Sequence, residues 1–278
     1  MSAEVTKTAN ESRPSNLSRQ RLLRSLLPAV SLVLVLLLIW GFNPRAISYF
    51  GLNLMLNLAI PIALATIAQM CVMATNELDL SIGAFVGYVA CVTGTFMAIE
   101  PALAFLMLAG GIVVYMLAAV VIHLRGVPSI VVTLGLSFFW GGLALLIRPT
   151  PGGVAPEFLT AFLSWQPPFV PLPVVLAIVL ALSVHVLLMR SSYGAILRGS
   201  GGNERAIRRA GWSILKAKVA MFALAGFFGI LSGMLLVGVS SSADATMASG
   251  YTLLSIAGAV IGGAEFVGGR ISPIGAVI

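Results

Sequence analysis

Long apolar runs separated by short polar segments make up most of this chain. Eight of them approach the ~20 residues that a helix needs to cross a bilayer, at residues 26–42, 52–74, 80–98, 102–122, 128–147, 172–189, 217–239 and 251–267. A further apolar stretch, ISPIGAVI, starts at Ile271 like a ninth window and stops with the chain. The pattern predicts an all-α integral membrane protein with about eight transmembrane helices over residues 26–278, preceded by a polar tail over residues 1–25.

The composition excludes a soluble fold. Only 9% of the residues are charged and 59% are hydrophobic, whereas a soluble domain carries about 25% charged residues. The polar lead before the first window is long, and Asn43-Pro44-Arg45 after it does not resemble a signal-peptide cleavage site. We therefore expect the first window to be a retained span.

Basic residues predict the orientation, because cytoplasmic loops of membrane proteins collect Lys and Arg. If the N-terminus is cytoplasmic and the windows alternate, all 16 Lys and Arg residues except Arg45 and Arg148 lie on the cytoplasmic side. This predicts an inner-membrane protein with a cytoplasmic N-terminal tail and a cytoplasmic loop over residues 190–217. It also accounts for the net charge of +7, so no nucleic-acid partner is expected.

Motifs for catalysis or energy supply are missing from the sequence. It contains no GxxxxGK[ST], HExxH or GxSxG pattern and no metal-ligand spacing of Cys or His, so we expect no catalytic residue, cofactor or metal in this chain. Buried acids of the kind that couple ions in secondary carriers are also few, namely Glu77, Asp79, Asp244 and Glu265. A channel or carrier energised by a partner fits better than an enzyme.

The basic segment GSGGNERAIRRAGW, residues 199–212, predicts a short helix. Asn203 suits an N-cap, Glu204 suits the first turn, and Gly211 is placed to end the helix. A solvated loop that fixes membrane orientation would explain its arginines. A docking surface for a cytoplasmic partner would explain both the arginines and the capped helix.

Two further stretches are candidates for lining a translocation path. In NELDLSIGAFVG, residues 76–87, Asp79 or Ser81 could cap a helix in a tight turn; the alternative is a broken, re-entrant start whose irregular backbone lines a cavity. In residues 126–142, Thr133 and Ser137 favour close helix packing, with contact to a solute as the alternative.

The Gly-rich stretch after Gly250 predicts tight helix packing and a turn. Gly258 and Gly262 have the spacing of a small-residue packing face. The turn that follows predicts a local ion pair between Glu265 and Arg270.

Four stretches in this order resemble the membrane permease subunits of bacterial ABC sugar importers of the ribose type, which are related to branched-chain amino acid permeases. The likeness covers about residues 50–278. The matching residues are Asp79-Leu80-Ser81-Ile82-Gly83; Val127-Pro128-Ser129 with Val132-Thr133-Leu134-Gly135; Gly202-Asn203-Glu204, Ala206, Arg208 and Gly211; and Gly250-Tyr251, Ile256-Ala257, Ile261-Gly262-Gly263 and Gly268-Gly269-Arg270.

The resemblance implies a monosaccharide importer with a second permease copy as homodimer or heterodimer, cytoplasmic ABC ATPase subunits that bind the ATP, and a periplasmic substrate-binding protein. The residues that match the family's ATPase-coupling helix are Asn203, Glu204, Ala206, Arg208 and Gly211. The chain departs from the family at Thr252 and Leu254, where relatives often carry acids. It also stops where the family's roughly ten-helix permeases continue through about two more spans, so we expect a truncated product or fragment.

Three alternatives stay open. The same architecture could import a branched-chain amino acid, a nucleoside, an autoinducer-like sugar or another small polar solute. An ion-coupled carrier would work without an ATPase. A membrane scaffold would bind partners without transporting a solute.

Overall fold

The computed structural model describes residues 29–278, so the predicted tail over residues 1–25 lies outside the described part of the chain. Within that part, every named element is helical. After an apolar helix at Ala29–Phe42, the elements are η1 (Pro44–Ile47), α2 (Tyr49–Ala74), α3 (Ile82–Phe96), α4 (Pro101–Arg125), α5 (Ser129–Ile147), α6 (Glu157–Ser164), α7 (Leu172–His185), η2 (Val186–Arg190), α8 (Ser192–Gly202), α9 (Glu204–Arg209), α10 (Ile214–Ser240), α11 (Tyr251–Ile261) and α12 (Pro273–Val277).

Each of the eight apolar windows overlaps an apolar helix in the described residues. Five are long and apolar enough to cross a membrane, namely α2, α4, α5, the continuous run Leu172–Arg190 and α10. Three are shorter: Ala29–Phe42, α3 and α11. The all-α membrane fold predicted from the sequence is therefore confirmed. The sequence pattern gave no signal for the short helices α6 and α8.

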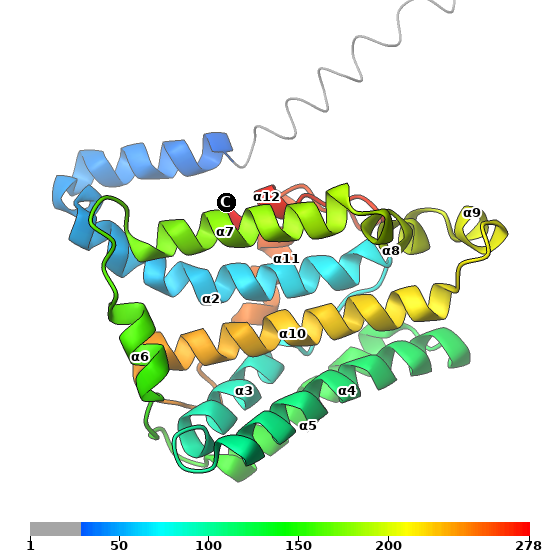
Figure 1. Cartoon of the computed structure of the whole chain (residues 1–278), viewed down its shortest axis with the longest axis horizontal. Helices are drawn as coiled ribbons and strands as arrows, with labels where there is room; N and C mark the ends of the chain where they lie inside the picture. The colour runs from blue at the N-terminus through cyan, green and yellow to red at the C-terminus, as the bar shows by residue number, and fades with distance from the viewer. Residues whose placement is uncertain (1–28) are drawn as a thin grey trace, which may run out of the picture.

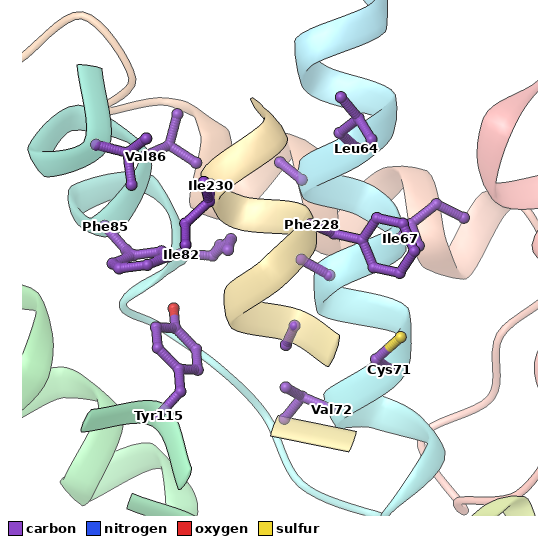
Figure 2. Packing of buried hydrophobic residues seen from close by; sticks show 14 of the residues in the cluster. Leu64, Ile67, Cys71, Val72, Ile82, Phe85, Val86, Tyr115, Phe228 and Ile230 are labelled. Atoms are coloured by element: carbon purple, nitrogen blue, oxygen red, sulfur yellow. The ribbon is translucent and has the colours of Figure 1, made fainter. Parts of the chain in front are cut away.

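The centre of the fold is the pairing of α2 with α10 (Figure 1). Figure 2 shows Phe228 of α10 directed at Ile67 of α2 within the apolar core. Small residues in α10 let α3 approach closely, because a Cβ on Gly233 would lie only 2.6 Å from the Val89 Cβ. On one side of this pair lie α3, α4 and α5, and on the other lie α7, α11 and α12.

The long helices run between two ends of the molecule, which we name by the short helices found there. At the α9 end, α2, α4 and α7 finish and α5 and α10 begin (Figure 1). At the α6 end, α6 lies across the ends of the long helices. Among the described basic residues, only Arg45 and Arg148 belong to the α6 end. The charge asymmetry read from the sequence is thus an asymmetry between the two ends of one bundle.

The helix α11 is shorter than its predicted window over residues 251–267. It ends at Ile261, and Gly262 then packs backbone to backbone against Gly275 of α12, where an added Cβ would lie 2.5 Å from the Gly275 carbonyl carbon. Gly258 does form a packing face, since its Cβ would lie 3.0 Å from Thr66 Oγ1 of α2. The predicted ion pair in the following turn is confirmed, with Arg270 Nη1 3.0 Å from Glu265 Oε2.

Candidate functional site

The chain between α2 and α3 is not a tight turn but a non-helical segment, residues 76–81, which starts at the exposed Asn76 and becomes buried at Asp79 and Ser81. It leaves the end of α2 through Asn76, which has a φ of +63°. It then turns back along the bundle, so that α3 begins part of the way along the long helices (Figure 1). Asp79 and Ser81 are fully buried. The stretch is therefore a broken start and not a tight turn, and its lining of a cavity stays a prediction.

Asp79 is held by hydrogen bonds from its own segment and from α4. The Ser81 N–H and hydroxyl donate to Asp79 Oδ1 at 2.7 and 2.6 Å, and the Tyr115 hydroxyl donates to Oδ2 at 2.8 Å. Figure 2 shows the Tyr115 hydroxyl directed toward the start of α3 near Ile82. Asp79 therefore accepts bonds that fix the entry into α3, although the N-cap residue Ser81 makes no side-chain cap of its own.

The partners of Asp79 show how deeply the segment enters the bundle. The Gln69 amide, oriented so that both of its polar atoms are paired, donates to the Asp79 carbonyl oxygen at 2.9 Å and accepts from its N–H at 3.3 Å. At a rise of 1.5 Å per residue, Gln69 lies about 7 Å before the end of α2, and Tyr115 lies about 15 Å before the end of α4. The segment thus runs at membrane depth, where unpaired backbone groups are costly.

Side chains from other helices bond further backbone groups of this segment. The Leu78 N–H donates to Ser129 Oγ at 3.1 Å, and the Leu80 N–H donates to Thr133 Oγ1 at 3.1 Å. On the other side, the Gly83 N–H at the start of α3 donates to Thr252 Oγ1 of α11 at 3.1 Å. Irregular backbone at this depth is stable because α5 and α11 supply the bonds that a regular helix would make itself.

Three of the four residues predicted for the path meet at this segment. Thr133 is buried and contacts the segment that holds Asp79 and Ser81. Ser137 lies one turn further along α5, is only partly buried, and donates to the Leu134 carbonyl oxygen of its own helix at 2.7 Å. The structure therefore brings Asp79, Ser81 and Thr133 together and leaves Ser137 at the edge.

Sequence reasoning missed three partners of the segment: Gln69, Tyr115 and Thr252. Each is a polar side chain inside or at the edge of an apolar window. A polar residue at membrane depth needs a hydrogen-bond partner, and that need is the signal that could have marked them.

The second part of the site is the short helix α9. Asn203 caps it, since its Oδ1 accepts from the Ala206 N–H at 3.1 Å. Gly211 follows with a φ of +81°, a left-handed conformation that favours glycine. No residue of α9 is buried, and Arg208 Nη2 lies 3.7 Å from Glu204 Oε2 across one turn. The predicted N-cap and the predicted stop at Gly211 are both confirmed.

Three glycines join the end of α8, just before α9, to the end of α2. A Cβ on Gly201, at the end of α8, would lie 2.1 Å from the Ala74 carbonyl oxygen, and one on Gly268 would lie 2.7 Å from the Gly201 oxygen. The Gly269 N–H donates to the Ala74 carbonyl oxygen at 2.8 Å. Stretches far apart in the sequence therefore meet as bare backbone, which we call the glycine junction (Ala74, Gly201, Gly268 and Gly269).

A buried lysine lies between α9 and the segment 76–81. Lys218 Nζ, from the start of α10, lies 2.6 Å from Glu77 Oε1 and 3.8 Å from Glu204 Oε1. Lys218 and Glu77 are mostly buried, whereas Glu204 is partly exposed. The first residue of α9 and the second residue of the segment thus share one ammonium group.

Comparison with known proteins gives one family and several relatives. The family model described as branched-chain amino acid transport system / permease component matches residues 51–278. An autoinducer 2 import system permease protein from Enterobacter sp. (strain 638) is 29% identical over 259 residues, which cover 90% of this chain and 79% of the relative.

Two relatives from Escherichia coli (strain K12) match over similar lengths. A ribose import permease protein is 27% identical over 89% of this chain and 81% of its own length. A galactofuranose transporter permease protein is 28% identical over 80% of this chain and 68% of its own length. No solved structure matches this chain significantly.

Proposed function

The chain belongs to the family of branched-chain amino acid transport system permease components, and from this premise we propose that it carries a monosaccharide inward across the bacterial inner membrane by alternating access. As a permease subunit it is not itself an enzyme, and a separate ATPase hydrolyses the ATP. The sugar class is supported by the relatives, whose names include ribose, autoinducer 2 and galactofuranose import. The same architecture importing another small polar solute is the second candidate, because the family description names branched-chain amino acids.

The proposal rests on the exposure of α9 and on its attachment to the bundle through the glycine junction. The six-residue helix is capped at Asn203 and closed at Gly211, and four of its six residues are exposed in the described part of the chain. It is nevertheless tied to the bundle through the glycine junction. A docking site for an ATPase needs both properties, since it must be accessible and must pass movement to the spans. We assign Asn203, Glu204, Ala206, Arg208 and Gly211 to this coupling surface.

The orientation follows from the charge of the two ends. The α9 end carries most of the described Lys and Arg residues, and such residues favour the cytoplasmic side. We therefore place α9 and the N-terminus in the cytoplasm, and α6 in the periplasm. The substrate-binding protein would then meet the α6 end, and a second permease copy would complete the translocation path.

For the path itself, we assign different roles to the four candidate residues. Asp79, Ser81 and Thr133 are buried. Asp79 and Ser81 belong to residues 76–81, and Thr133 of α5 hydrogen-bonds to the backbone of that segment. We propose that these three residues frame the path by fixing residues 76–81. Ser137 is partly exposed, and its hydroxyl donates only to a carbonyl oxygen of its own helix. It is the one of the four that we place on a solute-accessible surface.

Site-specific cross-linking tests the proposed function. A photo-reactive amino acid is placed at Arg205 of α9 and, as a control, at Phe158 of α6 at the opposite end, and native membranes are irradiated. We expect the α9 probe to form an adduct with a P-loop ATPase and the α6 probe to form none with that protein. An ATPase adduct from α6 and not from α9 would reverse the orientation. Absence of any ATPase adduct from a folded chain would favour the ion-coupled carrier.

A further inference from the structure

Lys218 holds two acidic groups that belong to different parts of the site. One is Glu77 at 2.6 Å, whose side chain is 14% exposed, and the other is Glu204 at 3.8 Å, whose side chain is 44% exposed. The Lys218 side chain itself is 9% exposed. A buried ammonium group is unfavourable unless it is paired and hydrogen-bonded, so its position depends on where its carboxylate partners are.

The two partners hold Lys218 with different strength. The Glu77 contact is short, charge-assisted and shielded from water, which are the conditions for a strong interaction. The Glu204 contact is longer and partly solvated, and Glu204 also pairs with Arg208 at 3.7 Å, so this contact is weaker and more easily changed. Lys218 therefore has one firm attachment to the segment 76–81 and one adjustable attachment to α9.

Glu77 is directly followed by the residues that hydrogen-bond to neighbouring helices. The next N–H, of Leu78, donates to Ser129 of α5, and Asp79 lies one residue further on. A shift of the Glu77 carboxylate would therefore be passed to the backbone at Leu78, where the hydrogen bonds to neighbouring helices begin. A chain of contacts therefore runs from Glu204 of α9 to Lys218, from Lys218 to Glu77, and from Glu77 into residues 78–81.

We propose that Lys218 is a positioning residue that passes movement of α9 to the non-helical segment 76–81 through its shared pairing with Glu204 and Glu77. When an ATPase engages α9, Glu204 changes its distance from Lys218, and the balance between the two carboxylates moves the Glu77 side of the pair. This inference rests on the proposed function, because it takes α9 to be the surface on which the ATPase acts.

Hydrogen–deuterium exchange on the whole complex tests this. The chain is purified with its co-purifying ATPase, reconstituted in nanodiscs, and compared with and without ATP plus orthovanadate. In the wild type we expect exchange to change both in peptides that cover α9 and in peptides that cover residues 76–81. In Lys218→Met, the response of α9 should persist while the response of residues 76–81 falls roughly fivefold or more, the lower end of typical coupling between sites.

Three further variants separate positioning from simple stabilisation. Glu265→Gln removes an exposed ion pair at the same end and should behave like the wild type. Lys218→Arg should retain part of the response. The reversed pair Glu77→Lys with Lys218→Glu should restore thermal stability but not the response, because the new carboxylate at position 218 repels Glu204. If Lys218→Met does not fold, this reversed pair alone decides the question.

The outcomes distinguish this inference from the proposed function. An unchanged response of residues 76–81 in Lys218→Met, or full recovery of the response in the reversed pair, would overturn the positioning role and leave the ATPase docking intact. A wild-type chain whose α9 shows no response to ATP and vanadate in the presence of the ATPase would overturn the proposed function and this inference together.

Discussion

The Tyr115 hydroxyl donates a 2.8 Å hydrogen bond to Asp79 Oδ2, although the two residues are 36 positions apart in the chain. Both groups are fully buried. This bond ties the middle of α4 to the non-helical segment between α2 and α3, and with the Ser81 bonds it gives the Asp79 carboxylate three donors. A buried carboxylate with this many bonds stabilises the fold of residues 76–81 and also belongs to the candidate site.

Removal of the Asp79 carboxylate should destabilise the protein more than its replacement by an amide. Asp79→Ala removes the acceptor of the Ser81 N–H and leaves the Ser81 and Tyr115 hydroxyls, which lie 3.2 Å apart, to bond each other, so the N–H and one hydroxyl proton lose their acceptor, at about 1–3 kcal/mol for each unsatisfied group. Asp79→Asn keeps one acceptor oxygen, so its loss should be smaller. Thermal unfolding in detergent, followed by size-exclusion of the tagged protein, measures both. Equal stability of Asp79→Ala and the wild type would show that these bonds do not hold the segment.

Thr133 and Ser137 offer a matched comparison one turn apart on α5. Thr133→Val keeps the shape but leaves the Leu80 N–H without its acceptor, so we expect a loss of about 1–3 kcal/mol in unfolding free energy. Ser137→Ala removes a hydroxyl that bonds only within its helix and should change stability by less than about 0.5 kcal/mol. Relative to the stability that each variant loses, Ser137→Ala should reduce solute uptake more than Thr133→Val. A large stability loss in Ser137→Ala would contradict the division of roles between frame and path.

The glycine junction predicts a large loss of stability when Gly201 is replaced and little change when the adjacent Gly202 is replaced. Gly201→Ala puts a Cβ 2.1 Å from the Ala74 carbonyl oxygen, so α8 must move away from α2, and we expect a loss of at least about 1–3 kcal/mol together with reduced uptake. At Gly202 the nearest atoms would be 3.5 Å away. Gly202→Ala is therefore the control, with an expected change below about 1 kcal/mol. Similar melting temperatures for the two variants would argue against the junction.

Charge reversal on α9 should remove ATPase docking without preventing membrane insertion. Arg205, Arg208 and Arg209 are exposed, and their simultaneous change to Glu would oppose an acidic docking groove. Gly211→Pro should have the same effect, because proline cannot adopt the φ of +81° found there. The amount of ATPase that co-purifies with the tagged chain is the measurement. Arg45→Glu, at the opposite end, is the control and should leave that amount unchanged.

The sequence predicted the helices well because membrane spans leave a strong local pattern. A run of about 20 apolar residues is typical of a membrane-spanning helix and uncommon elsewhere, and the cap at Asn203 and the stop at Gly211 depend only on neighbouring residues. The end of α11 was placed six residues too late, at residue 267 in place of Ile261, because the apolar run continues past it. The chain turns there to let Gly262 meet Gly275, which is a tertiary contact.

The architecture of the site could be predicted only in part for the same reason. Asp79 and Thr133 were identifiable as polar residues in apolar surroundings. Nothing local shows that Thr133 faces the backbone of Leu80, or that Tyr115 reaches Asp79, since these contacts depend on which helices are neighbours. The sequence predicted a packing face only at Gly258 and Gly262, and nothing local indicated that Gly201 and Gly269 would meet at Ala74.

The central claim, that this chain is a permease driven by ATP, is tested most directly by uptake into proteoliposomes. The chain, its co-purifying ATPase and the substrate-binding protein are reconstituted together, and entry of a panel of labelled monosaccharides that includes ribose is followed. We expect accumulation of one of these sugars that requires ATP, stops with orthovanadate and is insensitive to dissipation of sodium and proton gradients. Accumulation that follows an ion gradient and needs no ATPase would contradict the claim.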